Sequence, residues 1–298
     1  MIKEPIKSWY GTMSSLLKDK RSLAIFVSLY VLLLGALYGF VAIREATVWQ
    51  VILTMLFIAL APVLFFVLQA AIIRHAQAGR IDWPAVLRSS TKLALVTIPV
   101  ILIGLGFMWL LNRWQHHFPA PLFNPSLPPT APHGAPPPKV VPPLHWLTVL
   151  FASARLLVFG VVLPLSLVHL WIDASRSELT AFARGGRQAI ITRIGNFFAR
   201  AFAPVAVLVY VIGLLIFGVI PYTLLFVHKP AKGAWTDIVI LGVRLALFFA
   251  FILVGWLITL SALARQTADP NAAIAESAAD DSHPSGTTTA EEATASAV

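Results

Sequence analysis

Two arginines stand within segments that are largely apolar and long enough to cross a membrane. Arg155 lies in 146–172 and Arg244 lies in 238–263, and neither segment contains an acidic residue. An ionisable residue at membrane depth is a candidate functional group. A guanidinium there can bind a phosphate or another anion through charge-assisted hydrogen bonds.

Further polar residues share a helical face with these arginines. Ser166 and His169 recur on the face of Arg155 at helical spacing, and Thr259 recurs on the face of Arg244. Polar groups that share a face are expected to point into a helix bundle, because lipid cannot satisfy them. The sequence therefore predicts an anion- or lipid-binding site from Arg155, Arg244, Ser166 and His169. The alternatives are snorkelling arginines that anchor to outer-leaflet phosphate, and a neutral, hydrogen-bonded histidine.

Three more arginines are candidates for contact with lipid headgroups at the inner membrane surface. Arg184 and Arg187 flank two glycines, an arrangement that could cradle a phosphate, and Arg88 precedes another apolar segment. The alternative for 184–187 is a basic patch that meets anionic lipid in general.

The chain offers no recognisable catalytic or metal-binding motif. It has no cysteine, no P-loop, no G-x-S-x-G and no H-E-x-x-H, and its external histidines match no defined metal spacing. We therefore predict no catalytic residue, no metal and no cofactor.

Composition places the chain among membrane proteins. Of its 298 residues 58% are hydrophobic and 12% are charged, whereas a soluble domain carries about 25% charged residues. The net charge of +9 gathers beside the apolar segments, which indicates anionic lipid headgroups rather than nucleic acid as the partner.

Six segments are long enough to span a hydrocarbon core, which takes roughly 20 residues of helix. We predict an all-α polytopic integral membrane protein, because unpaired backbone groups cannot face lipid. The expected spans are Ser22–Ile43, Val48–Ile73, Leu93–Leu111, Trp146–Ile172, Phe202–Val227 and Ile238–Ala264.

The distribution of basic residues sets the expected orientation. The two termini and the segments 74–92 and 173–201 together hold fifteen Lys and Arg, and the opposite connections hold five. The positive-inside rule then places both termini in the cytoplasm. We expect the six spans to lie in a bacterial inner (plasma) membrane.

Outside the spans the chain divides into segments of different character. Residues 1–21 form a basic segment, expected to contain an interfacial helix over 3–17, and 22–264 form the transmembrane domain. Within that domain, 112–145 has eleven prolines and is expected to be an extended external loop. Amphipathic interfacial helices are expected over 178–200 and, shorter, over 81–92. The acidic tail 265–298 is expected to be disordered.

The three helices that return inward align without gaps, which indicates a threefold repeat of hairpins. Leu53, Arg155 and Arg244 fall at one position, and Arg74, Arg176 and Arg265 follow each of them by 21 residues. The alternative is chance similarity between apolar segments.

These features favour a non-enzymatic protein, a lipid-engaging scaffold or accessory subunit that also contacts a protein partner. The first alternative is a transporter or flippase-like protein that moves an anionic or lipid-like solute past Arg155 and Arg244. The second alternative is a lipid-modifying enzyme. A cavity lined by both arginines would favour transport.

Overall fold

The computed structural model describes residues 3–43, 47–118, 146–176, 197, 199–227 and 233–267. Within these residues the secondary structure is helical, and six helical stretches are long and apolar enough to span a membrane. The chain is thus an all-α, multi-pass membrane protein, as predicted. The candidates Arg184 and Arg187, the expected helix over 178–200 up to residue 196, and the tail beyond 267 lie outside the described residues, whereas 199–201 are helical.

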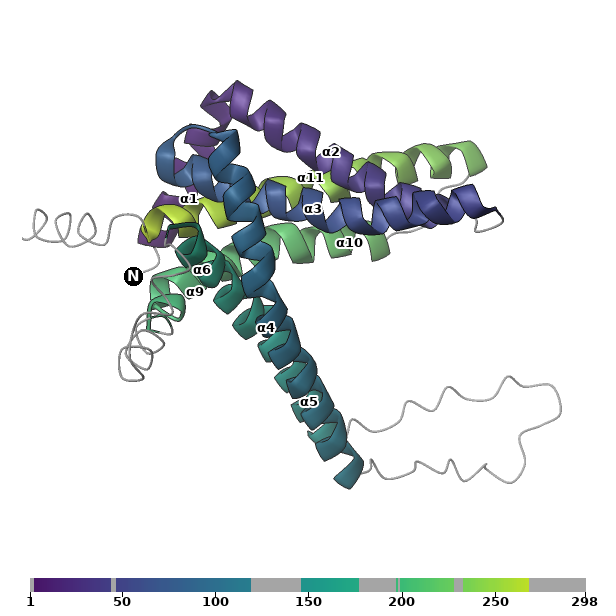
Figure 1. The fold of residues 1–298 in the computed structure, drawn as a ribbon. Helices are drawn as coiled ribbons and strands as arrows, with labels where there is room; N and C mark the ends of the chain where they lie inside the picture. The colour runs from purple at the N-terminus through teal and green to yellow at the C-terminus, as the bar shows by residue number, and fades with distance from the viewer. Residues whose placement is uncertain are drawn as a thin grey trace, which may run out of the picture.

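The six spans form three antiparallel hairpins (Figure 1). The first hairpin pairs α2 (Lys20–Ala42) with α3 (Val48–Ala78). The second pairs α4 (Trp83–His117) with the continuous stretch of α5 (Trp146–Leu157), η1 (Val158–Val162) and α6 (Leu163–Arg176). The third pairs the stretch of α9 (Pro204–Leu214), η2 (Leu215–Val219) and α10 (Ile220–Phe226) with α11 (Ala234–Gln266).

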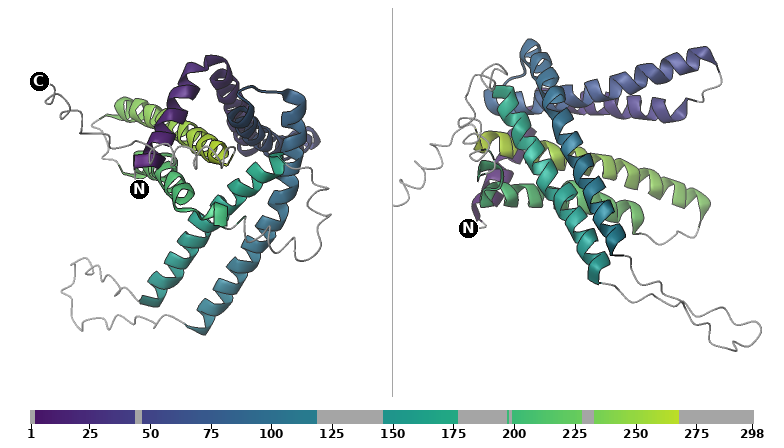
Figure 2. Two further views of the ribbon diagram at one scale, coloured as in Figure 1. Left: turned by 90° about the vertical axis from the view of Figure 1, so that its left-hand side faces the viewer. Right: turned by 60° about the horizontal axis from the view of Figure 1, so that its bottom comes forward.

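The hairpins meet at one end and diverge toward the other. We call the shared end basal, because α1 (Lys3–Lys18), the turn from α3 to α4 and the ends of α6 and α11 lie there. The opposite, distal end holds the tips of the hairpins. Figures 1 and 2 show the second hairpin pointing away from the other two. The protein therefore resembles a tripod rather than a closed bundle.

The close-packed core occupies the basal half of the protein. Buried apolar side chains cluster where the inner parts of α3, α6 and α11 meet, over 67–73, 165–172 and 257–264. The distal halves instead expose large apolar side chains, which include Met55, Leu102, Ile103, Leu156, Leu157, Ile238 and Val239. Since a spanning helix is solvated by hydrocarbon, those distal surfaces are lipid-facing positions.

Helix α1 lies across the basal end. Its Leu16 and Thr12 are buried, and Trp9 and Met13 pack against the core. A helix was expected over 3–17, and α1 covers it; its apolar face packs against the core. The turn from α3 to α4 uses Gly79 in the left-handed region, with φ of 68°, where glycine carries no Cβ penalty.

Two expectations about α4 were wrong. Residues 81–92 do not form a separate interfacial helix, because α4 runs without a break from Trp83 to His117 with Pro84 in its first turn, where proline is tolerated. Residues 112–117, expected in the extended external loop, are the last turns of this same helix. The remainder of that loop, 119–145, lies outside the described residues.

Short π-helical segments interrupt two spans just before a proline. The segment η1 precedes Pro164, and η2 precedes Pro221. A proline lacks an amide hydrogen and its ring crowds the carbonyl four residues earlier, so the helix adjusts locally. The amide of Leu163 accordingly bonds the carbonyl of Val158, five residues back.

The first two hairpins share a packing feature at one aligned position of the predicted repeat. A Cβ built on Gly39 would lie 2.8 Å from Phe57, and one built on Gly104 would lie 3.7 Å from Phe159. Phe57 and Phe159 occupy the same aligned position of the repeat. The third aligned phenylalanine, Phe248, contacts Phe249 edge-on instead. The threefold repeat therefore stays a prediction.

Candidate functional site

Arg155 joins the two helices of its own hairpin. Its Nη2 donates to Oδ1 of Asn112 at 2.8 Å and to Oε1 of Gln115, both on α4. Asn112 and Gln115 are three residues apart, so they present neighbouring side chains on one helix face. Arg155 itself is half-buried, and its Nε is buried without a hydrogen-bond partner within the described residues.

Arg244 plays a related part in the third hairpin. Its Nη2 donates to the carbonyl of Val227, at 3.4 Å, where α10 has just ended. The last carbonyls of a helix lack partners within the helix and carry partial negative charge, so a cation is favourable there. Arg244 thus caps the paired helix within its own hairpin.

The structure does not bring Arg155 and Arg244 into one site. Their hydrogen bonds stay within the second and the third hairpin, and Figure 2 shows these hairpins diverging toward their distal ends. Each arginine lies where its paired helix ends or turns polar. The sequence could not show this, because it carries no information about how far apart the hairpin tips stand.

Ser166 and His169 also separate from Arg155. The predicted stripe assumed an unbroken α-helical period, whereas the π-helical residues 158–162 lie between Arg155 and Ser166 and change the phase. His169 is buried, and its Nδ1–H donates to the carbonyl of Leu165 at 2.9 Å. The Ser166 hydroxyl is buried without a partner in the described part of the chain.

Of the three headgroup candidates, only Arg88 is described. It lies in the second turn of α4, close to the basal end, and is exposed. An exposed arginine beside the start of a span can reach the phosphate layer. The prediction for Arg184 and Arg187 stays open.

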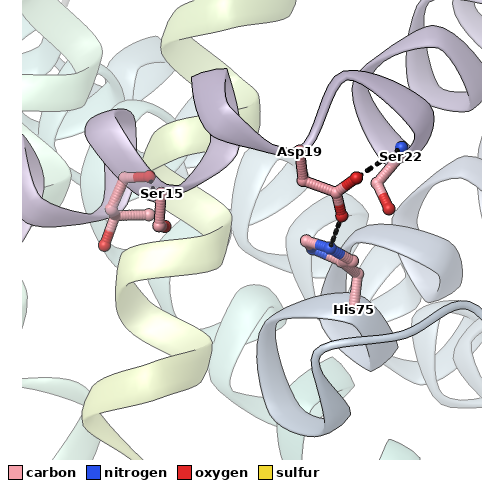
Figure 3. A network of polar contacts seen from close by, with 5 residues as sticks. Ser15, Asp19, Ser22 and His75 are labelled. Atoms are coloured by element: carbon pink, nitrogen blue, oxygen red, sulfur yellow. Dashed lines mark hydrogen bonds and ion pairs between the residues drawn. The ribbon is translucent and has the colours of Figure 1, made fainter.

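A polar pair that the sequence analysis missed joins α1, α2 and α3 at the basal end. Asp19 accepts hydrogen bonds from the amide of Ser22 at 3.2 Å and from Nε2–H of His75 at 3.0 Å, as Figure 3 shows. These bonds, from Ser22 first and His75 second, lower the pKa of Asp19 to about 2. His75 is 5% exposed and meets Phe26 edge-on.

One part of this pair had a sequence signal. An aspartate just before an apolar helical segment is a common N-cap, and Asp19 caps α2 in this way. His75 is 56 residues further along the chain. No local pattern joins two residues so distant.

Hydrogen bonds in the basal half join all three hairpins. Gln77 donates to Ser175 at 3.1 Å, which links the first hairpin to the second, and Trp256 donates to Gln69 at 2.7 Å, which links the third to the first. Arg176 donates to the carbonyl of Ala264 at 3.2 Å and so links the second to the third. These contacts fix the hairpins to one another at the basal end.

Comparisons with protein-family models, with curated proteins and with solved structures found no match. The functional argument therefore depends on the geometry. In the described residues no group of three or more histidine, aspartate or glutamate side chains lies close enough to hold a metal ion. The geometry shows a basal half that is joined by hydrogen bonds, and two half-buried arginines in the distal halves, where large apolar side chains are exposed.

Proposed function

We propose that the protein is a non-enzymatic, lipid-engaging scaffold or accessory subunit of a membrane. The observation that carries this proposal is the tripod arrangement. The hairpins are bonded together in the basal half, while their distal halves diverge and expose large apolar side chains. Lipid can surround each distal half separately, so the protein presents much more apolar surface to lipid than a closed bundle would.

The positions of the two arginines support lipid engagement rather than transport. Arg155 precedes Arg176 by 21 residues, and Arg244 precedes Arg265 by 21, which is about 32 Å of helix. A hydrocarbon core is ~30 Å thick. If the basal arginines lie at one surface, the distal arginines lie at the phosphate layer of the other.

The proposed setting is the bacterial inner membrane, with the basal end on the cytoplasmic side. The fifteen-to-five distribution of basic residues supports this orientation, because the basic connections belong to the basal end. Anionic headgroups there are the proposed partners of Arg88 and of the basic connection 177–196. A protein partner is proposed to bind at the same basal, cytoplasmic end.

Reconstitution into phospholipid vesicles tests the scaffold against the transporter. We expect vesicles with the parent protein to leak small anions and to exchange lipid between leaflets no faster than vesicles without protein. The variants Arg155→Leu, Arg244→Leu and Arg113→Leu should behave alike. Transport that is present in the parent and lost in Arg155→Leu or Arg244→Leu, but kept in Arg113→Leu, would establish the transporter instead.

A further inference from the structure

We propose that Arg155, Asn112 and Gln115 form a binding site for the phosphate group of a phospholipid in the distal leaflet. This inference rests on the lipid-engaging function proposed above and names the ligand and the residues. It differs from the sequence-based prediction, which combined Arg155 with Arg244, Ser166 and His169. The structure assigns the site to one hairpin.

The guanidinium of Arg155 has donors to spare. A guanidinium carries five N–H groups in a planar fork that matches phosphate oxygens. The bonds to Asn112 and Gln115 both start from Nη2, and Nε is buried without a partner in the described residues. Nη1 makes no hydrogen bond within the described residues and is not buried, so it is the part of the fork open to another acceptor, whereas the buried Nε is not.

The charge of Arg155 is also uncompensated. Its two partners are neutral amides, and no carboxylate bonds it within the described part of the chain. A half-buried cation without a counter-ion is unfavourable, so an anion that reaches it gains both charge neutralisation and hydrogen bonds. Arg244 differs, because its acceptor is a helix-end carbonyl that already carries partial negative charge.

The two amides contribute donors of their own. Because Oδ1 of Asn112 and Oε1 of Gln115 face the guanidinium, each NH₂ group points away from it. Asn112 is exposed and Gln115 is half-buried. These NH₂ groups and Nη1 of Arg155 make no hydrogen bond within the described residues, so the cluster of Arg155, Asn112 and Gln115 carries several unused donors. A phosphate, with its several acceptor oxygens, matches such a set better than a halide does.

The site lies at the depth of lipid phosphates. The apolar run of α4 ends at Leu111, and the polar residues 112–117 follow directly. The same depth follows from the ~32 Å between Arg155 and Arg176 along the helix. Trp109, over whose ring Arg113 lies at 5.8 Å, belongs to the interfacial aromatic belt.

The surroundings of Arg155 favour a lipid over free phosphate as the source of this group. Leu156 is 74% exposed and Leu157 is 59% exposed, directly beside Arg155 on the basal side. A lipid whose phosphate binds Arg155 extends its acyl chains in that direction, toward the bilayer centre. Free phosphate would gain nothing from these side chains.

Titration of the purified full chain in detergent with a short-chain phosphatidylglycerol tests the site. We expect saturable binding that weakens roughly tenfold or more in Arg155→Leu, because charge-assisted bonds are lost. Asn112→Asp should weaken binding similarly while it preserves the fold, because its carboxylate neutralises Arg155 internally. The diacylglycerol with the same chains should not bind, and excess inorganic phosphate should not displace the lipid.

The matched control is Arg113→Leu, which lowers the net charge by one, as Asn112→Asp does, but leaves the Arg155 contacts in place. It should bind like the parent. If folded Asn112→Asp also binds like the parent, Arg155 serves only to join its hairpin and the site is overturned, although lipid engagement stands. Displacement by inorganic phosphate would overturn the lipid assignment. If the parent binds no phospholipid, the proposed function itself fails.

Discussion

The hydroxyl of Tyr210 donates to the carbonyl of Gly160 at 2.9 Å, from the third hairpin to the second. Gly160 is four residues before Pro164, and its carbonyl would ordinarily accept from the amide that a proline lacks. The π-helical segment η1 surrounds this residue. Tyr210 therefore compensates for the proline from a neighbouring hairpin, so a helix defect becomes a link between hairpins.

Replacing Tyr210 by phenylalanine should destabilise the protein by about 1 kcal/mol, because the part-buried carbonyl of Gly160 loses a partner. Thermal unfolding in detergent measures the change. Tyr222→Phe is the matched control, since Tyr222 is 60% exposed on α10. Pro164→Ala restores the missing amide, so in that background Tyr210→Phe should lower the melting temperature less than it does in the parent protein. Equal melting temperatures for the parent and Tyr210→Phe would refute this account of the proline.

The Asp19–His75 pair should make stability depend on acidic pH. The pKa of Asp19 is lowered from 3.8 to about 2 in the folded protein. A carboxylate of this kind contributes stability that is present above its unfolded pKa and lost as pH falls toward its folded pKa. The difference in melting temperature between the parent and Asp19→Asn should therefore shrink between about pH 5 and 2.

The control for this prediction is Asp82→Asn. Asp82 is the N-cap residue of α4 but makes no capping hydrogen bond with its side chain. Its replacement should leave the melting temperature nearly unchanged at every pH. A constant difference between the parent and Asp19→Asn across the whole range would contradict the assigned role of Asp19.

Close packing within the third hairpin depends on Gly213. A Cβ at this position would lie 2.7 Å from Cγ2 of Thr259, and such overpacking typically costs about 1–3 kcal/mol. Gly213→Ala should therefore lower the melting temperature. Gly242→Ala on α11 meets nothing within 4 Å and should leave it unchanged or raise it, since alanine favours a helix by about 1 kcal/mol. A lower melting temperature for Gly242→Ala than for Gly213→Ala would show that the hairpin is packed differently.

The orientation can be measured with fused reporters. A reporter placed after residue 265 should lie in the cytoplasm, and one inserted near Gly134 should lie outside, because the basic residues gather at the basal end. Since the chain has no cysteine, single introduced cysteines can verify the result with membrane-impermeant reagents. Both reporters on one side of the membrane would overturn the six-span topology.

The sequence predicted the spans well, because the thickness of hydrocarbon sets the length of an apolar helix. For example, Ser22–Ile43 was expected and α2 covers Lys20–Ala42. It predicted the continuity of α4 poorly. Polar residues such as Arg88 and Lys92 resemble a surface helix, but nothing stops the helix between them and the span.

The candidate site was only partly predictable. Arg155 was identified because a charge in an apolar segment is conspicuous, whereas Asn112 and Gln115 were placed in a loop because prolines follow them. The residues whose side chains bond across hairpins lie far apart in the chain. For example, Gln69 and Trp256 are separated by 187 residues. Local sequence patterns carry no signal for such pairs. Yet these pairs hold the basal halves of the helices together, while the distal halves diverge.

We propose above all that this protein engages lipid with the distal halves of its hairpins. The most direct test of this proposal is the thermal stability of the purified, delipidated protein with and without added phospholipid. A ligand that binds the folded state raises the free energy of unfolding by RT ln(1 + [L]/Kd), so the melting temperature rises with the concentration of the ligand. We predict a melting temperature that rises steadily with phosphatidylglycerol concentration, and retention of phospholipid by the untreated protein in native mass spectrometry. An unchanged melting temperature, together with no retained lipid, would contradict the claim.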